Sequence, residues 1–498
     1  MKDYQTDYIK LALPKGRFLS PTASLLAEIG LGFEGYSDKT KQYRLRSARF
    51  PSLSAKILQE KDIPIQVAVG NYDLGICGSD WIEEYLVKYP TGALVKMSSL
   101  NYGEGSIHVV ASAQSGITSL DELSSRTSDC RVVSEYPNLA EAFALNLRMR
   151  RFRIFPVWGA AEAYPPENAD LAVLWGRSRA HIATQGLIPL EKLLSVTAFL
   201  IANRESLEDK DLSQILMCFD SQLSTDLPAC SPYDFGRRAE AWQAGPQASI
   251  ENELNICKDL KITRPSWPAK EINLALPDGH QQAPAAQFLK QAGLALQGYS
   301  EEEVSRRPSA DLDWLGIKVI RPQDMPLQVA NSNFDLAITG EDWLREHLYR
   351  FPSSPVKKLF ALGFGTVKIV VAVSQEIPVN NIDELRSLVQ SDPDYIGVPL
   401  KVASEYVNIA DKYLRDNHIN PYKLIPTWGA SEAFLPEDAD MLIDNAQTGK
   451  TLEQQKLKII DVLFQSSACL IANKDNLASS HKREKIKFLT QKLRAGLR

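Results

Sequence analysis

A tandem repeat constrains the fold of this 498-residue chain more than any other feature of its sequence. Three motifs occur twice in the same order: LALP at 11–14 and 274–277, WGA at 158–160 and 428–430, and LIAN at 200–203 and 470–473. The offset between equivalent residues grows only from 263 to 270, so few insertions separate the copies. Since each copy is long enough to bury its own core, we predict two copies of one domain.

Each copy opens with a short apolar stretch, at 9–13 and 272–276, which runs into a proline-x-glycine turn and then a helix ending at Gly30 or Gly293. Strand, turn and helix in repetition indicate an α/β domain with mainly parallel strands. After this first part of each copy the sequence predicts a second set of strands, followed by a final apolar strand with which the chain returns to the first part. This course predicts two lobes per copy with a cleft between them.

The predicted boundaries are 1–228 for the first copy, 229–269 for a linker and 270–498 for the second copy. The lobes are predicted at about 7–100 plus 190–228, about 101–189, about 270–360 plus 458–498, and about 361–457. The linker is interrupted by prolines and has no repeat partner; one short helix is predicted within it, at about 250–259.

Composition and charge exclude several kinds of partner. The chain has 56 Lys and Arg against 61 Asp and Glu, so its net charge of −5 gives no general reason to bind nucleic acid or an anionic membrane. No apolar run reaches membrane-spanning length, and the polar first residues do not resemble a targeting peptide. The six cysteines form no pair at metal or redox spacing. A cytoplasmic protein is expected, in which any phosphate site is local.

The two copies differ at two turns. The sequence KGR at 15–17 corresponds to DGH at 278–280, and TGKT at 448–451 corresponds to SRAH at 178–181. Each copy therefore keeps one turn suited to an anion and has lost the other.

The turn kept by the second copy is predicted between a strand that ends near Asp444 and a helix. Backbone amides and hydroxyls that converge at such a turn favour a phosphate monoester. A simple threonine–glycine helix cap with a solvated lysine is the alternative. The residues of this turn are Thr448, Gly449, Lys450, Thr451 and Leu452.

The turn kept by the first copy carries two cations, Lys15 and Arg17, on either side of Gly16. Glycine lets the backbone approach a ligand, and the cations would favour an anion that gains charge during a reaction. They are equally suited to the phosphates of a nucleotide. Ordinary surface charge on a strand-to-helix turn is the alternative.

Around 440–452 and 466–471 the second copy closely resembles the catalytic core of ATP phosphoribosyltransferase, the enzyme family that catalyses the first step of histidine biosynthesis. The resemblance extends over both copies, including LPKGR at 13–17 and RPQDMP at 321–326, and leaves out only the linker. It implies a bilobal, periplasmic-binding-protein-like (type II) core in each copy. It also implies transfer of a phosphoribosyl group from phosphoribosyl pyrophosphate to N1 of ATP, with Mg²⁺, and release of pyrophosphate.

The resemblance also implies a role for each candidate residue. The turn at 448–452 would hold the 5-phosphate, and Asp444 with Asp440 would accept hydrogen bonds from the ribose hydroxyls. Catalysis would rest on Asp444, Lys15 and Arg17, because adenine N1 attacks the sugar directly and the protein must align the reactants and stabilise charge. Candidates for binding ATP or pyrophosphate are Lys15, Gly16, Arg17, Arg321 and Glu432. The metal ligands are unknown.

Two arrangements fit these assignments. Either the active site combines the retained turns of both copies, or it lies in the second copy alone, where Asp278 would repel pyrophosphate. The first copy has Leu174 at the ribose-facing position and Arg179 at the turn glycine, so it is predicted to be inactive by itself. A homo-oligomer or a pseudo-dimer within one chain is expected, and a separate regulatory subunit is compatible with either.

Two other functions compete with the enzyme. A non-catalytic regulatory protein that binds nucleotide or phosphoribosyl compounds would explain why both copies carry losses. A transport-type binding protein shares the architecture but rests on likeness of fold alone. Trp158 and Trp428 are candidates for stacking on adenine, although aromatic residues in apolar surroundings usually belong to a core.

Overall fold

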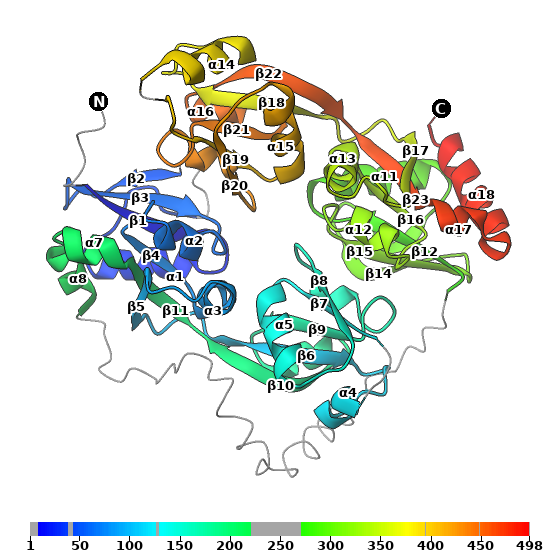
Figure 1. The fold of residues 1–498 in the computed structure, drawn as a ribbon. Helices are drawn as coiled ribbons and strands as arrows, with labels where there is room; N and C mark the ends of the chain where they lie inside the picture. Colours follow the sequence, from blue (N-terminus) through cyan, green and yellow to red (C-terminus); the bar gives the residue numbers. More distant parts are fainter. Residues whose placement is uncertain are drawn as a thin grey trace. The chain divides into compact units, whose positions relative to one another are not determined.

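The computed structural model describes residues 8–37, 43–125, 129–220, 270–393, 395–447 and 449–497. The chain divides into two compact units (Figure 1). The first-copy unit holds Lys2–Val157 and Tyr164–Trp267, whereas the second-copy unit holds Pro268–Arg498 together with the segment Trp158–Ala163. The predicted linker, 229–269, lies outside the described residues.

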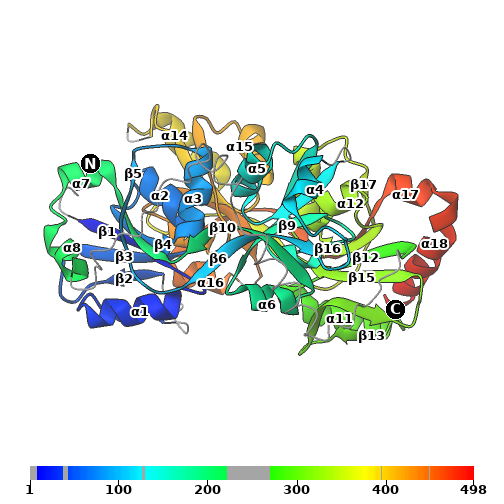
Figure 2. The same ribbon diagram turned by 90° about the horizontal axis from the view of Figure 1, so that it is seen from below.

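The first lobe of the first-copy unit is a six-stranded sheet in the order β2-β3-β1-β4-β11-β5. β1 pairs in parallel with β3 and β4, while β11 pairs antiparallel with β4 and β5. α1 covers one face of this sheet, and α2 and α3 cover the other (Figure 2). The elements are β1 (Ile9–Pro14), α1 (Leu19–Glu28), β2 (Arg44–Arg46), β3 (Leu53–Leu58), α2 (Ile63–Ala68), β4 (Leu74–Gly78), α3 (Ser79–Lys88), β5 (Leu94–Ser99), β11 (Ala198–Asn203), α7 (Arg204–Asp209) and α8 (Ser213–Asp220).

The second lobe of this unit is a five-stranded sheet in the order β10-β6-β9-β7-β8. β7 pairs in parallel with β8 and β9, and β6 pairs antiparallel with β9 and β10. The elements are β6 (Gly105–Ser112), α4 (Leu120–Ser125), β7 (Cys130–Ser134), α5 (Pro137–Asn146), β8 (Phe152–Pro156), β9 (Leu171–Gly176), α6 (Arg179–Thr184) and β10 (Leu187–Val196).

The second-copy unit repeats this plan with sheets in the orders β15-β12-β16-β23-β17 and β20-β19-β21-β18-β22, and adds the pair β13-β14. The segment Trp158–Ala163 contributes the 3-10 turn η1 (Ala161–Ala163). The elements of the first lobe are β12 (Ile272–Pro277), η2 (Gly279–Gln281), α11 (Gln282–Gln291), β13 (Leu296–Tyr299), β14 (Val304–Ala310), β15 (Leu315–Ile320), α12 (Met325–Ala330), β16 (Leu336–Gly340), α13 (Glu341–Arg350), β17 (Val356–Ala361), β23 (Ala468–Asn473), α17 (Lys474–Ala478) and α18 (Ser480–Ala495). Those of the second lobe are β18 (Val367–Ser374), α14 (Ile382–Ser391), β19 (Leu400–Ser404), α15 (Val407–Asp416), β20 (Tyr422–Pro426), η3 (Ser431–Phe434), β21 (Met441–Ala446), α16 (Lys450–Gln454) and β22 (Leu457–Ser466).

The predicted duplication of a two-lobed α/β domain is confirmed, with a parallel core in each of the four larger sheets. The likeness to periplasmic binding proteins stays a prediction. These sheets also contain antiparallel strands, such as β11 and β23, which return from the other lobe and enter the sheet from the opposite direction. The exact domain and lobe boundaries stay a prediction. Among the described residues no helix is both long enough and apolar enough to cross a membrane.

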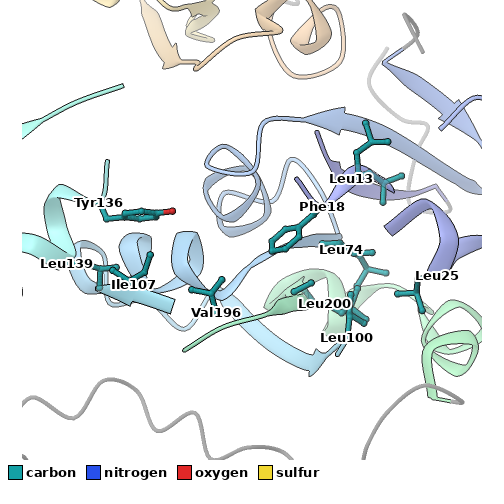
Figure 3. Packing of buried hydrophobic residues seen from close by; sticks show 14 of the residues in the cluster. Leu13, Phe18, Leu25, Leu74, Leu100, Ile107, Tyr136, Leu139, Val196 and Leu200 are labelled. Atoms are coloured by element: carbon teal, nitrogen blue, oxygen red, sulfur yellow. The ribbon is translucent and has the colours of Figure 1, made fainter. Parts of the chain in front are cut away.

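The two units differ in how their cores are joined. In the first-copy unit one hydrophobic cluster runs through both lobes, from Leu13 in β1 to Ile107 in β6 (Figure 3). In the second-copy unit the described residues form separate clusters, one around Leu276 in the first lobe and one around Ile369 in the second. The two lobes therefore share one hydrophobic core in the first copy, whereas each lobe has its own core in the second.

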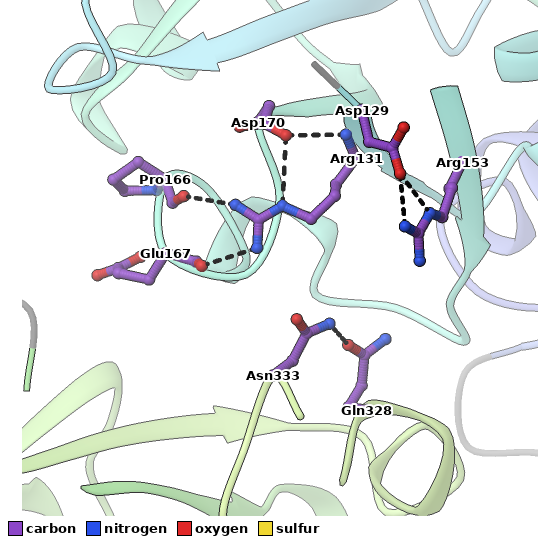
Figure 4. Close-up of polar contacts among 8 residues, drawn as sticks. All are labelled: Asp129, Arg131, Arg153, Pro166, Glu167, Asp170, Gln328 and Asn333. Carbon is purple, nitrogen blue, oxygen red and sulfur yellow. Dashed lines mark hydrogen bonds and ion pairs between the residues drawn. The ribbon is translucent and has the colours of Figure 1, made fainter. Parts of the chain in front are cut away.

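An aspartate that precedes a central strand ties that strand to its neighbour in both copies. Oδ2 of Asp170 accepts the backbone amide of Arg131 at 2.8 Å (Figure 4). Oδ2 of Asp440 accepts the amide of Lys401 at 2.8 Å in the same way. This carboxylate is thus part of the fold at the amino end of the strand, and the duplication has preserved it.

Candidate active site

Asp444 lies near the carboxyl end of β21 and is only 9% exposed. Its Oδ1 accepts the backbone amide of Asn445 at 2.7 Å, and the hydroxyl of Ser431 donates to its carboxylate. Burial raises the pKa of Asp444 to about 7, and the charges of Glu432 and Asp342 add to this shift against the two hydrogen bonds. Once it is ionised, the carboxyl group of Asp444 can accept hydrogen bonds from sugar hydroxyls.

Asp342, at the start of α13, reaches from the first lobe into the second. Its Oδ2 accepts the Tyr406 hydroxyl at 2.8 Å, and its Oδ1 accepts the Ser466 hydroxyl at 3.0 Å. The side-chain amide of Asn445 donates to the Tyr406 oxygen at 3.3 Å and to Asp444 Oδ1 at 3.2 Å. A polar network therefore connects the two lobes and ends at Asp444.

The glycine turn follows β21 directly. Gly449 has φ +74, a left-handed conformation that a side chain would strain, and it precedes α16. Because the residue before α16 is glycine, it has no side chain with which to cap the first amides. Lys450 and Thr451 are exposed and Leu452 is buried. Thr448 lies outside the described residues.

The equivalent turn of the first copy is closed. The Ser178 hydroxyl accepts the backbone amide of His181 at 3.1 Å and so caps α6 from within. Arg179 stands where Gly449 stands in the second copy, and Leu174 replaces Asp444. The carboxylate of the second copy is not found here.

Arg17 is held by carboxylates of its own copy. Its Nε lies 3.0 Å from Glu60 and its Nη2 lies 2.5 Å from Asp80, while the rings of Phe18 and Trp175 lie 4.6 and 4.9 Å from its Cζ. Burial alone would lower the pKa of Arg17, but the two carboxylates raise it. Burial in turn raises the pKa of Glu60 to about 7. Arg17 is therefore an internal counter-ion in this structure.

Lys15 makes weaker contacts with neighbouring side chains than Arg17 does. Its Nζ lies 3.5 Å from the Tyr43 hydroxyl and 5.3 Å from the centre of that ring. Gly16 and Gly279 both have positive φ, at 87 and 68, so both copies keep the shape of the turn while its charge is reversed.

Asp278, which replaces Lys15 in the second copy, is bound by two arginines. Its Oδ2 lies 2.9 Å from Nη1 of Arg306, and its Oδ1 lies 3.3 Å from Nη1 of Arg321. Arg306 also contacts Glu162 at 3.0 Å. The negative charge expected to repel pyrophosphate is thus met by cations, and Arg321 already has an anionic partner.

A family model described as HisG, ATP phosphoribosyltransferase, matches residues 59–221 and again 321–495. This chain belongs to that family. The ATP phosphoribosyltransferase of Chlorobaculum parvum is 30% identical over 231 residues, which are 45% of this chain and 71% of that protein. The enzyme of Saccharolobus solfataricus is 32% identical over 233 residues, 46% of this chain and 73% of that protein. A solved structure, the ATP phosphoribosyl transferase (HisG:HisZ) complex from Thermotoga maritima, shares 21% identity and covers 45% of this chain and 98% of its own, with a TM-score of 0.37.

Of the residues predicted for this ATP phosphoribosyltransferase site, the structure brings Asp444 and Glu432 together. It does not bring Asp440 to them. Four residues along a strand separate two side chains on one face by roughly 13 Å, and the Asp440 carboxylate is bonded to Lys401 at the far end of β21. Asp440 and Asp444 therefore lie at opposite ends of β21, and the assignment of Asp440 to the ribose stays a prediction.

Sequence reasoning missed three residues of the interlobe network, which are Asp342, Tyr406 and Ser466. A signal existed for the first of them, because an acidic residue follows the strand-ending glycine in both copies. The pairing of Asp342 with a tyrosine 64 residues away has no local signal.

Trp158 is packed within the second-copy unit. Its backbone amide donates to both carboxylate oxygens of Asp324 at 3.1 Å. Its ring centre lies 5.6 Å from that of Trp343 and 6.5 Å from that of Trp428. These contacts are those of an aromatic cluster and match the core interpretation of both tryptophans.

Proposed function

We propose that the cleft of the second copy transfers a phosphoribosyl group from phosphoribosyl pyrophosphate to N1 of ATP and releases pyrophosphate, the first step of histidine biosynthesis. One observation carries this assignment to the second copy: the buried carboxyl group of Asp444 stands just before a glycine turn, and the first copy has neither.

Asp444 would fix the sugar. Ionised, it accepts hydrogen bonds from the ribose hydroxyls, while the turn from Thr448 to Leu452 holds the 5-phosphate through its amides and hydroxyls. The anomeric carbon is then fixed for attack by adenine N1. Alignment of this kind contributes on the order of 7 kcal/mol to catalysis, so no protein nucleophile is needed.

Mg²⁺ is proposed as the cofactor. Among the described residues no three His, Cys, Asp or Glu side chains lie close enough to hold a metal ion by themselves. The residues present fit an ion bound mainly by substrate phosphates with one or two carboxylates, which Glu432 and Asp444 would supply. When bound, the ion would neutralise the leaving diphosphate.

Lys15, Gly16 and Arg17 stay proposed as groups that bind pyrophosphate or ATP. Lys15 is the stronger candidate of the two cations, because Arg17 would first have to leave Glu60 and Asp80. Arg321 would likewise have to exchange Asp278 for a phosphate. Action as a homo-oligomer, location in the cytoplasm and control by a separate regulatory subunit are further parts of the proposal.

The test is turnover of ATP and phosphoribosyl pyrophosphate with Mg²⁺ by the purified full chain. Asp444→Ala should lower kcat/KM by about 10² or more, since it removes a charged hydrogen-bond acceptor of the substrate worth roughly 3 kcal/mol. Leu174→Ala, the matched change in the first copy, should leave kcat/KM within about twofold. Full activity of Asp444→Ala would overturn the assignment, and binding of both substrates without turnover by the wild type would favour a regulatory protein.

Lys15→Ala, assayed alongside, tests whether the first copy contributes to the reaction. A loss of kcat/KM of about tenfold or more would support the role of Lys15 in stabilising the leaving group. Unchanged kinetics would restrict the site to the second copy.

A further inference from the structure

A second pocket of the second-copy unit lies between the last turn of α13 and one face of α15. Its volume is about 420 Å³, within the range of small-molecule sites. α13 belongs to the first lobe and α15 to the second, so the pocket spans both lobes. Arg350 stands eight residues after Asp342, which along a helix is roughly 12 Å, so this pocket is separate from the candidate active site. Its lining includes Tyr349, Arg350, Asn408, Asp411, Lys412 and Arg415.

The lining is cationic. Arg350, Lys412 and Arg415 face one carboxylate, that of Asp411, which also accepts the Tyr422 hydroxyl at 2.6 Å. Arg415 pairs with Asp411, and Lys412 lies 2.8 Å from the exposed Asp416. Exposed pairs of this kind contribute little to stability, so both cations can exchange their partners for a ligand.

The pocket also offers an aromatic surface. Tyr349 is 39% exposed, and Nζ of Lys412 lies 5.7 Å from the centre of its ring. A ring-bearing ligand could pack on this face while its anionic group meets the three cations.

The first copy forms the same interlobe junction with one of these cations, because Lys88 stands at the position of Arg350, but without the other two. Glu84 accepts the amides of Asn138 and Leu139 at 2.9 Å, just as Glu346 accepts those of Asn408 and Ile409. At the positions of Lys412 and Arg415, however, the first copy has Ala142 and Leu145. Packing of the two helices therefore does not require Lys412 and Arg415, which points to another role for these two cations.

We propose that this pocket binds a small phosphorylated molecule and holds α13 and α15 together when it does so. Three cations around one cavity suit a phosphate group, and the exposed tyrosine ring suits a ring attached to it. Arg350 also acts through its charge on Glu346, the carboxylate that joins the two helices. Such binding is independent of phosphoribosyl transfer at Asp444.

Pyridoxal phosphate gives a test that is resolved by site. Its aldehyde condenses with a lysine amine, water leaves, and borohydride reduces the imine to a stable amine that peptide mass spectrometry locates. Lys423, an exposed lysine of the same unit, is the control within the chain. The hydrogen bond to Asp416 raises the pKa of Lys412, so its amine has no intrinsic advantage as a nucleophile.

In the full chain, Lys412 should be labelled about fivefold or more faster than Lys423, and inorganic pyrophosphate should protect only Lys412. Arg415→Leu, which installs the residue of the first copy, should lower Lys412 labelling roughly threefold to tenfold. Asp411→Asn should raise it, because the repelling charge is gone while an oxygen remains for Tyr422. Equal labelling of Lys412 and Lys423, or no protection by pyrophosphate in a wild-type chain of normal melting temperature, would overturn the proposal.

Discussion

In each copy the region between the lobes, where the sequence predicts a cleft, has the same strand arrangement but is lined with opposite kinds of side chain. At four positions where the lobes meet, the first copy has an apolar residue and the second copy has a polar one. The pairs are Phe18 and Gln281, Leu174 and Asp444, Trp175 and Asn445, and Val196 and Ser466. The first cleft is consequently part of a continuous hydrophobic core, and the second separates two cores.

The side chains of the first cleft are closely fitted. A Cβ at Gly103 would lie 1.9 Å from the ring of Phe18, and one at Gly105 would lie 2.4 Å from Nε1 of Trp175. The second copy has Val367 where Gly105 makes room for that tryptophan. The first copy thus fills the region between its lobes by close packing, whereas the second has buried polar groups there that packing alone would not favour.

The buried aspartate of α3 and α13 shows the same exchange. Asp80 is balanced by the guanidinium of Arg17, whereas its equivalent Asp342 relies on the hydroxyls of Tyr406 and Ser466. Burial raises the pKa of Asp342. The second copy thus keeps a buried carboxyl group with no cationic partner among the described residues, whereas the first copy pairs the equivalent group with Arg17.

Filling the second cleft like the first should have the largest effect. The double change Gln281→Phe with Asn445→Trp should lower kcat/KM by about 10³ or more, because it removes the space and the polar partners around Asp444. Steady-state kinetics and calorimetry with phosphoribosyl pyrophosphate would measure the loss. The double variant must retain its circular dichroism spectrum; a folded variant with normal turnover would show that the polar cleft is not the site.

The next largest effect should be on stability. Phe18→Ala removes a fully buried ring from the continuous core and should cost about 3–5 kcal/mol in free energy of unfolding. Gln281→Ala, at the equivalent position, should cost about 1 kcal/mol or less, because the buried Oε1 of Gln281 has no hydrogen-bond partner among the described residues. Urea titration of both variants compares the two clefts directly, and equal losses would contradict the proposed difference in packing.

Sequence alone predicted the duplication and the α/β lobes, because repeated motifs and the ends of strands are local signals; the role of Asp444 stays a prediction. The family resemblance grouped Asp440 with Asp444, but Asp440 precedes β21 whereas Asp444 lies near its carboxyl end. The rule that ligands gather at the carboxyl ends of parallel strands separates the two.

Other features of the site have no local signal. Arg17 meets Glu60 from 43 residues away, and Asp278 meets Arg306 and Arg321 from two different strands. A charge in a turn predicts that a partner exists, but only the fold decides whether that partner is a ligand or another residue of the chain.

The pH dependence of the reaction should report Asp444. Since the pKa of this carboxyl group is about 7 and the ionised form is the one proposed to bind ribose, kcat/KM should fall about tenfold per pH unit below 7. Because burial raises this pKa above its unfolded value, the stability contribution has the opposite sign: it is present below about pH 4 and is lost as pH rises through 7.

Asp444→Asn is the control for both trends. Its residual kcat/KM should lose the pH step near 7. Its free energy of unfolding should improve relative to wild type as pH rises from about 4 to 7, measured by urea titration at each pH. A wild-type profile that is flat between pH 5 and 8 would contradict the proposed role of the carboxylate.

A smaller effect is expected from Asp278→Asn, which moves the charge of the second-copy turn toward that of the first. The change releases Arg306 and Arg321 from a carboxylate, so affinity for inorganic pyrophosphate should rise roughly threefold to tenfold by calorimetry. Glu162→Gln, which removes the other partner of Arg306, serves as the matched control. No gain in either variant would mean that these arginines are structural.

The smallest effect concerns a feature that the copies share. Ala160 and Ala430 both have left-handed backbone conformations, with φ of 61 and 55, in the same tryptophan–glycine–alanine turn. A side chain in this region costs roughly 1 kcal/mol, part of which glycine loses again through the entropy of its unfolded state. Ala430→Gly and Ala160→Gly should therefore each stabilise the protein by about 0.5 kcal/mol. Thermal unfolding of the two variants measures this, and a gain in one copy with a loss in the other would show that the turn has diverged along with the clefts.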